Sequence, residues 1–261
     1  MWSWKSIAGK LPYRVRAEQA FRGPDIPFKS PLDSAMQTTH KLLLTFWLSF
    51  FAFAVPAGAE APNSDARTLL DIAGVERDPA RLSKSVLVII DAQREYLDGT
   101  LPLFDIDASL QEAKAVLDRA REAGTPVIHV VHNGKPGGAL FDPEGPYVAV
   151  ADALSPKHGE AVVTKGMPNA FAGTDLEERL SRLGRKDLIV IGYMTHMCVS
   201  ATVRAALDRG YRTTVVAKAT ATRDLPDGAG GVVSAQDVQR AALAALADRF
   251  ATVVPSADDL Q

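Results

Sequence analysis

The sequence predicts an α/β fold with a mainly parallel sheet, and three features of residues 85–254 support this prediction. Short apolar runs alternate with amphipathic segments of helical period. Several runs, such as SVLVIID at Ser85–Asp91 and DLIVIG at Asp187–Gly192, are rich in Val and Ile without polar alternation, which is typical of strands buried on both faces. Three of the segments between runs end at glycines, as helices commonly do.

The expected elements follow one another in a strand–helix order. The predicted strands are Ser85–Asp91, Pro126–His132, Ala161–Thr164, Asp187–Gly192, Tyr211–Ala217 and Ala251–Val254. The predicted helices are Asp107–Ala123, Thr174–Leu183 and Met197–Arg209, each followed by Gly, and the Ala- and Leu-rich segment Ser234–Arg249. Thr174 and Glu177 have the T-x-x-E spacing of a capping box, which predicts a helix start. Residues 62–84 are polar and helix-prone and lead into the fold.

The first 61 residues differ in composition from the rest of the chain. They contain all three Trp residues, and they carry seven Lys/Arg against four Asp/Glu. Lys41 precedes a 14-residue apolar run, Leu42 to Val55, which Pro56 and the small residues 57–59 follow. These are the three parts of a secretory signal peptide. We therefore expect residues 36–61 to be a signal peptide that starts at Met36, and residues 1–35 to be a non-native or disordered extension.

A signal peptide would place the mature domain, residues 62–261, in the periplasm or outside the cell. The apolar run is shorter than the about 20 residues of a membrane span, so no stable span is expected after processing; an N-terminal membrane anchor is the alternative. The net charge of −2 argues against a basic nucleic-acid binder. The single cysteine, Cys198, excludes an internal disulfide and a cysteine zinc site.

Three polar residues follow the carboxyl ends of predicted strands, which is where open parallel sheets bind ligands. Asp91 ends the first run, Lys165 follows AVVT, and Cys198 lies just after DLIVIG and the turn YMTHM. Each of these residues also has a non-catalytic interpretation. Asp91 would cap a turn, Lys165 would be a solvated strand end, and Cys198 would be an inert buried thiol. A thiol at a helix N-terminus, however, is favoured as thiolate and lies beside N–H groups that can bind an oxyanion. An acid, an amine and a thiol that converge are suited to nucleophilic catalysis.

Five stretches together resemble the isochorismatase-like cysteine hydrolase superfamily, which includes nicotinamidases and N-carbamoylsarcosine amidases: LVIIDAQREYLDG, PVIHVVH, TKGMPNAFAGTDLEERL, VIGYMTHMCVSATVRAALDRGY and VVAKATATRDLP. The resemblance covers about residues 84–255. It implies a Rossmann-like three-layer α/β/α fold with a mainly parallel sheet, the isochorismatase-like hydrolase fold. It also implies a catalytic triad of Asp91, Lys165 and Cys198, a cis Tyr193–Met194 peptide bond, and an oxyanion hole formed by the backbone N–H groups of Met194 and Cys198.

The resemblance implies hydrolysis of a small amide (C–N bond) through a thioester on Cys198, by a homo-oligomer without a cofactor. Isochorismatase-type ether hydrolysis is one alternative, although those relatives lack the nucleophilic cysteine. A non-catalytic ligand-binding protein on the same scaffold is another. The stretch after Asp91 lacks the metal-binding histidine of nicotinamidases. His129 and His132 are three apart on a strand, so they point to opposite faces. No metal site is expected.

Five further side chains are candidates for substrate binding. The resemblance implies that an apolar wall of the substrate pocket is formed by Tyr96, Phe171 and Tyr193. The alternative is that these three side chains only pack in the core. His132 ends a strand and His196 lies two residues before Cys198, so both are placed to contact substrate. The alternative for each is a structural role in which the ring is hydrogen-bonded within the fold. The Gly- and Pro-rich loop Asn133–Pro146 is suited to a flexible lid over the site.

Overall fold

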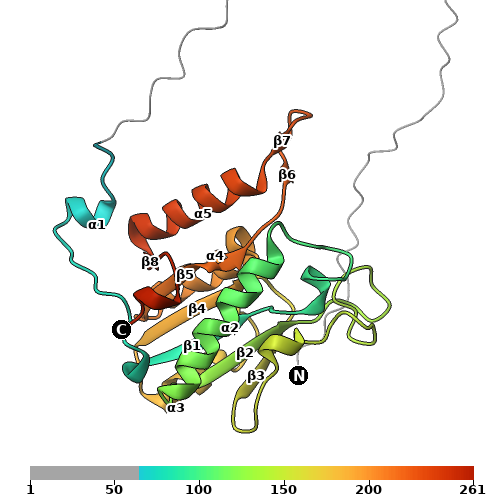
Figure 1. Ribbon diagram of the computed structural model, residues 1–261, viewed down its shortest axis with the longest axis horizontal. Helices are drawn as coiled ribbons and strands as arrows, with labels where there is room; N and C mark the ends of the chain where they lie inside the picture. The colour runs from blue at the N-terminus through green and yellow to red at the C-terminus, as the bar shows by residue number, and fades with distance from the viewer. Residues whose placement is uncertain (1–64) are drawn as a thin grey trace, which may run out of the picture. The chain divides into compact units, whose positions relative to one another are not determined.

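The computed structural model describes residues 65–261, so the predicted extension (1–35) and signal peptide (36–61) lie outside the described residues. A six-stranded parallel sheet has the order β3-β2-β1-β4-β5-β8 (Figure 1). Its strands are β1 (Ser85–Ile90), β2 (Val127–His132), β3 (Ala161–Lys165), β4 (Asp187–Tyr193), β5 (Arg212–Ala221) and β8 (Thr252–Val254). Each predicted strand is present, and the parallel sheet is confirmed.

The strand order places a ligand crevice next to β1. The chain builds outward from β1 to β2 and β3 on one side, and from β4 to β5 and β8 on the other. Loops that follow β1 and β4 therefore leave the sheet toward opposite faces, which opens a crevice at the carboxyl ends of these two neighbouring strands. Asp91 directly follows β1, and Cys198 follows β4 after four intervening residues.

Helices cover both faces of the sheet, as a three-layer fold requires. Helix α2 (Ile106–Glu122) packs against Leu87 and Ile89 of β1 (Figure 1). Helices α3 (Leu176–Leu183), α4 (Ser200–Asp208) and α5 (Ala235–Arg249) contribute to the core that contains Val88 and Ile90. Successive residues of a strand point to opposite faces, so these are two separate layers. All six residues of β1 are buried, which explains its continuous apolar sequence.

Two local predictions are wrong. The Thr174–Glu177 capping box does not form, because α3 begins only at Leu176, the Thr174 hydroxyl donates to Ala170 O, and Glu177 instead accepts a hydrogen bond from the Tyr211 hydroxyl. Strand β5 extends four residues beyond Ala217, because Thr220 and Ala221 pair with Gly192 and Tyr193 after a register shift that places extra residues in β5. These long-range partners are invisible in the local sequence.

Three short elements lie outside the predicted pattern. Helix α1 (Leu69–Ile72) begins with Thr68, whose side chain caps Asp71 N. Strands β6 (Leu225–Pro226) and β7 (Val232–Val233) form a hairpin that extends beyond the start of α5 in Figure 1. With two residues each, the hairpin strands are too short to give a periodic signal.

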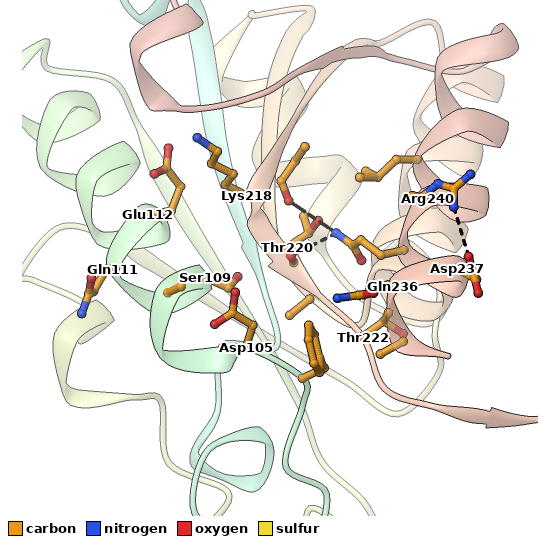
Figure 2. A pocket seen from close by; sticks show the side chains of 17 residues that line it. Asp105, Ser109, Gln111, Glu112, Lys218, Thr220, Thr222, Gln236, Asp237 and Arg240 are labelled. Carbon is orange, nitrogen blue, oxygen red and sulfur yellow. Dashed lines mark hydrogen bonds and ion pairs between the residues drawn. The ribbon is translucent and has the colours of Figure 1, made fainter. Parts of the chain in front are cut away.

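A groove of about 810 Å³ opens between α2 and α5, over the carboxyl-terminal half of β5 (Figure 2). It forms because β8 pairs only with Thr214–Val216, which leaves the later residues of β5 without a strand neighbour on that edge. Ser109 of α2 and Thr220 and Thr222 of the β5 segment line its floor. No helix among residues 65–261 has both the length and the apolarity needed to cross a bilayer.

Candidate active site

Close approach of β1 and β4 brings the loops after them together. Gly192 has φ +111°, and a Cβ atom there would lie 2.0 Å from Ile90 O, so only glycine fits at this position. Asp91 follows with a left-handed backbone (φ +47°) that non-glycine residues rarely adopt. The carboxylate is fully buried at the carboxyl edge of the sheet. The strained turn thus sets the direction of the Asp91 side chain at the crevice.

The turn that carries Cys198 is fixed by the two threonines of its motif. Residues Thr195–Val199 form a π-helical turn that leads into α4. The Thr195 hydroxyl donates to Ala221 O of β5 at 3.0 Å, and the Thr202 hydroxyl accepts from Ala170 N at 3.0 Å. The Tyr193–Met194 peptide bond is cis, as the resemblance implies. The Gly192, Thr195 and Thr202 positions of the motif therefore shape the backbone around the thiol.

Lys165 brings the three candidate groups together. Its Nζ lies 2.7 Å from Asp91 Oδ2, 3.3 Å from Cys198 Sγ and 3.0 Å from His132 Nδ1. The side chains of Lys165 and Asp91 are both fully buried, so each charge needs the other as its partner. The lysine therefore holds the acid and the thiol in one compact arrangement with water largely excluded.

The prediction that helix position favours a Cys198 thiolate is wrong for the resting site. Burial, with the nearby Asp91 charge, raises the pKa of the Cys198 thiol to about 12 despite Lys165. Burial also raises the pKa of Asp91 to about 6, although Lys165 opposes the shift. The charge of this carboxylate acts on the thiol. At neutral pH the site thus holds a neutral thiol beside a carboxylate base.

Burial, assisted by Lys165, sets the protonation of His132. Burial and the Lys165 charge lower the pKa of His132 to about 4, so the ring is neutral at pH 7. Because Lys165 can only donate, His132 Nδ1 accepts, and the ring proton lies on Nε2. His132 is half-buried at the end of β2. The ring is thus available as a hydrogen-bond donor at the rim of the site.

An aromatic wall borders this group. The Tyr96 ring contacts Phe141 at 5.2 Å and Tyr193 at 5.9 Å between centroids, and Phe141 contacts His132 at 5.0 Å, all edge-to-face. Burial, and after it the Asp91 charge, raises the pKa of the Tyr96 hydroxyl. Phe141, which the sequence analysis did not single out, belongs to the predicted lid loop.

Gln93 and Glu95, which follow Asp91 in the chain, anchor the surrounding loops. The Gln93 amide donates to His132 O and Val148 O and accepts from His132 N, at 2.7 to 2.9 Å. Glu95 accepts from Phe141 N at 3.0 Å and from Thr100 N at 2.8 Å. The loop Asn133–Pro146 is thus bonded to the segment after β1, and opening it would break these hydrogen bonds. The D-x-Q-x-E spacing from Asp91 is the signal that could have identified both residues.

Not every predicted side chain joins the group. Phe171 stacks on Tyr211 at 6.2 Å and lies under the Arg209 guanidinium, toward the start of β5. His196 lies at the edge, with Nδ1 2.6 Å from Thr222 Oγ1. His129 points to the other face, as predicted, and bonds to Glu160 at 2.9 Å. No cluster of three metal-binding side chains occurs within residues 65–261.

The same region matches known proteins. Residues 85–258 match the family described as Isochorismatase domain. The chain is 44% identical over 185 residues to the secreted isochorismatase effector Isc1 of Verticillium dahliae, covering 71% of this chain and 95% of that protein. It is 28% identical to the maleamate amidohydrolase of Pseudomonas putida, over 60% of this chain and 86% of that protein. A solved isochorismatase structure from Pseudomonas putida KT2440 is 46% identical, with a TM-score of 0.72, over 75% of this chain and 100% of that one.

Proposed function

This chain belongs to the isochorismatase family, and from that premise we propose that it is a cysteine hydrolase that cleaves the C–N bond of a small amide. The observation that carries the proposal is the contact of Lys165 Nζ with both Asp91 Oδ2 and Cys198 Sγ. An acid, an amine and a thiol at these distances are the parts of an activated nucleophile. The maleamate amidohydrolase among its relatives supports amide chemistry.

In the proposed reaction, Asp91 accepts the Cys198 proton as Sγ attacks the amide carbonyl carbon. The backbone N–H groups of Met194 and Cys198 stabilise the oxyanion, and Lys165 offsets the negative charge nearby. Asp91 then protonates the leaving nitrogen, the C–N bond breaks, and a thioester remains on Cys198. Water attacks the thioester with Asp91 as the base, which releases a carboxylic acid and restores the thiol. This scheme uses no cofactor. Tyr96, Phe141 and His132 would border the substrate.

Release of ammonia or amine from a panel of small amides tests this function. The panel should include primary amides, ureido acids and carbamoyl compounds, together with one vinyl ether. We expect nitrogen release from at least one amide and a transient acyl adduct on Cys198 in intact-mass spectra. Ether cleavage is a second candidate function, because the chain matches the Isochorismatase domain family. Cleavage of the ether alone, without an adduct, would favour that candidate, and binding of amides without turnover would favour a ligand-binding role.

The pH profile of turnover should have an acidic limb. Asp91 must be ionised to accept the thiol proton, and its pKa in the folded protein is raised to about 6. We therefore expect kcat/KM to be level above this pH and to fall about tenfold per unit below it. Steady-state assays from about pH 4.5 to 8 measure the limb. A profile that stays level down to about pH 4.5 would show that Asp91 is not the base.

We also propose that the protein is secreted. The apolar run Leu42–Val55 with its basic flank supports export. A relative described as a secreted effector is 44% identical. N-terminal sequencing of material recovered from the medium or the periplasm tests this. We expect the mature protein to begin near Glu60, and a mature protein that begins before residue 50 would contradict the proposed signal peptide.

Size-exclusion chromatography with light scattering tests the proposed homo-oligomer.

A further inference from the structure

The middle of the loop Asn133–Pro146 is attached to the rest of the protein at Phe141. Of the loop residues, Phe141 is the buried one, with 7% of it exposed. Among residues 65–261, one hydrogen bond joins the stretch 134–146 to a residue outside the loop, and it runs from Phe141 N to Glu95 Oε2 at 3.0 Å. The other hydrogen bonds of this stretch join residues within it. Phe141 therefore holds the middle of the loop in place.

The two ends of the loop are fixed independently of Phe141. Asn133 N donates to Lys165 O at 2.9 Å, and Glu95 N donates to Tyr147 O at 2.9 Å. Neither of these bonds has to break when the contacts of Phe141 are lost. The stretch between them can therefore open as a hinged unit whose ends stay on the sheet and on the segment after β1.

The backbone of Phe141 is strained in the closed position. Its φ is +51°, a left-handed conformation that non-glycine residues rarely adopt. Its carbonyl accepts from Gly134 N at 2.8 Å, and a Cβ atom on Gly134 would lie 2.3 Å from Leu140 O. Opening would release the strain, whereas burial of the ring and the hydrogen bond to Glu95 oppose it. The closed position thus depends on these two interactions.

The ring of Phe141 is linked to the candidate catalytic group. It lies edge-to-face against Tyr96 and His132. His132 Nδ1 is 3.0 Å from Lys165 Nζ, which is 3.3 Å from Cys198 Sγ. Only 4% of Cys198 is exposed. A substrate therefore needs an opening to reach Sγ, and the loop that carries Phe141 can provide one.

The Glu95 carboxylate joins two loops at this point. Its Oε1 accepts from Thr100 N at 2.8 Å, and its Oε2 accepts from Phe141 N. Glu95 is buried, with 3% of it exposed. A carboxylate accepts N–H hydrogen bonds more strongly than a neutral acceptor does. A single side chain thus ties the loop after β1 to the loop after β2.

We propose that Glu95 is a positioning residue for the reaction. Its hydrogen bond to Phe141 N holds the loop Asn133–Pro146 closed, and substrate enters and product leaves when this bond breaks and the Phe141 ring withdraws. The entry and release steps rest on the proposed function, in which Cys198 attacks the substrate. The closure itself depends only on the contacts of Phe141.

Alkylation of Cys198 by iodoacetamide, which forms a C–S bond and releases iodide, measures opening without any substrate. Cys198 is the only cysteine of the chain. Glu95→Met keeps an unbranched side chain but removes both carboxylate acceptors. We expect it to raise the labelling rate about tenfold or more, because losing a hydrogen bond to a charged group shifts the opening equilibrium by such a factor. Glu144→Met is the matched control, since Glu144 is exposed in the same loop. A rate that is unchanged in Glu95→Met, or raised equally in Glu144→Met, overturns the proposal.

The urea dependence of labelling separates opening of the loop from a general loss of stability. Local opening exposes little surface, so the labelling rate of Glu95→Met should stay level up to about 1 M urea. A rate that rises steeply in this range would show that the thiol is labelled through global unfolding, and it would overturn the proposal.

Gly134→Ala covers the case in which Glu95→Met does not fold. The added Cβ must displace Leu140 O, which disrupts the turn at Phe141 and leaves Glu95 unchanged. We expect this variant also to be labelled about tenfold faster than the wild-type protein. An unchanged labelling rate in Gly134→Ala would contradict the proposal.

Turnover separates this proposal from the proposed function. The assay uses the amide of the panel with the highest wild-type kcat/KM. We expect Glu95→Met to raise its KM about tenfold and to change kcat less than about twofold, because saturating substrate draws the loop closed. If no amide is hydrolysed but labelling depends on Glu95, the amidase function fails and the closure by Glu95 stands. If KM and the labelling rate are the same in both proteins, the amidase function stands and the closure by Glu95 fails.

Discussion

Cys198→Ala is expected to abolish amide hydrolysis and to leave the folded protein intact. Sγ is the atom that forms the thioester, and without it the remaining oxyanion donors and Lys165 cannot form the covalent intermediate. We expect kcat to fall at least about ten-thousand-fold, as for other enzymes that lose their nucleophile. The change removes a single buried atom and keeps the Cβ, so the free energy of unfolding should fall by only about 1 kcal/mol.

Ammonia release measures the loss of activity, and urea unfolding measures stability. Met197→Ala is the matched control, because Met197 is the neighbouring residue in the same turn and 40% of it is exposed. It should keep most of the activity. Turnover by Cys198→Ala above about one per cent of the wild-type rate would rule out covalent catalysis through this thiol.

Asp91→Asn should have the second largest effect. The amide has the shape of the carboxylate but cannot accept the Cys198 proton, so the variant lacks the base that the proposed reaction needs. We expect kcat to fall about a thousandfold or more, and raising the pH toward 8 should not restore it. The same change leaves the fully buried Lys165 ammonium without its ion-pair partner. The free energy of unfolding should therefore fall by about 3–5 kcal/mol.

The double variant Asp91→Asn/Lys165→Met separates the two effects. Replacing both members of a buried pair removes the unpaired charge, so stability should return toward the wild-type value while activity stays absent. Urea unfolding and ammonia release on the three proteins complete the comparison. Near-normal turnover by Asp91→Asn would eliminate Asp91 as the base. Recovery of activity in the double variant would mean that the single variant failed only through instability.

The approach of the three candidate residues follows from the topology. Apolar runs such as SVLVIID and DLIVIG identify strands that are covered on both faces, because no polar alternation interrupts them. In a parallel sheet their carboxyl ends meet at one edge, so Asp91, Lys165 and Cys198 were predictable as neighbours. Lys165 lies within 3.3 Å of both other residues. The glycine at position 192 was predictable as a motif residue. The physical reason that glycine is required there, the close approach of Ile90 O, was not predictable from the sequence.

The sequence by itself determined the strand order along the chain, the parallel α/β class and the three residues that meet at the sheet edge. These depend on periodicity and on residue type, which are local properties. Only the tertiary structure decided that Cys198 is a neutral thiol at rest, since its pKa depends on burial and on Asp91 more than on its helix. It also placed Phe141 beside His132 and turned Phe171 away toward Tyr211. Burial and pairing depend on residues far apart in the chain, and no local pattern encodes them.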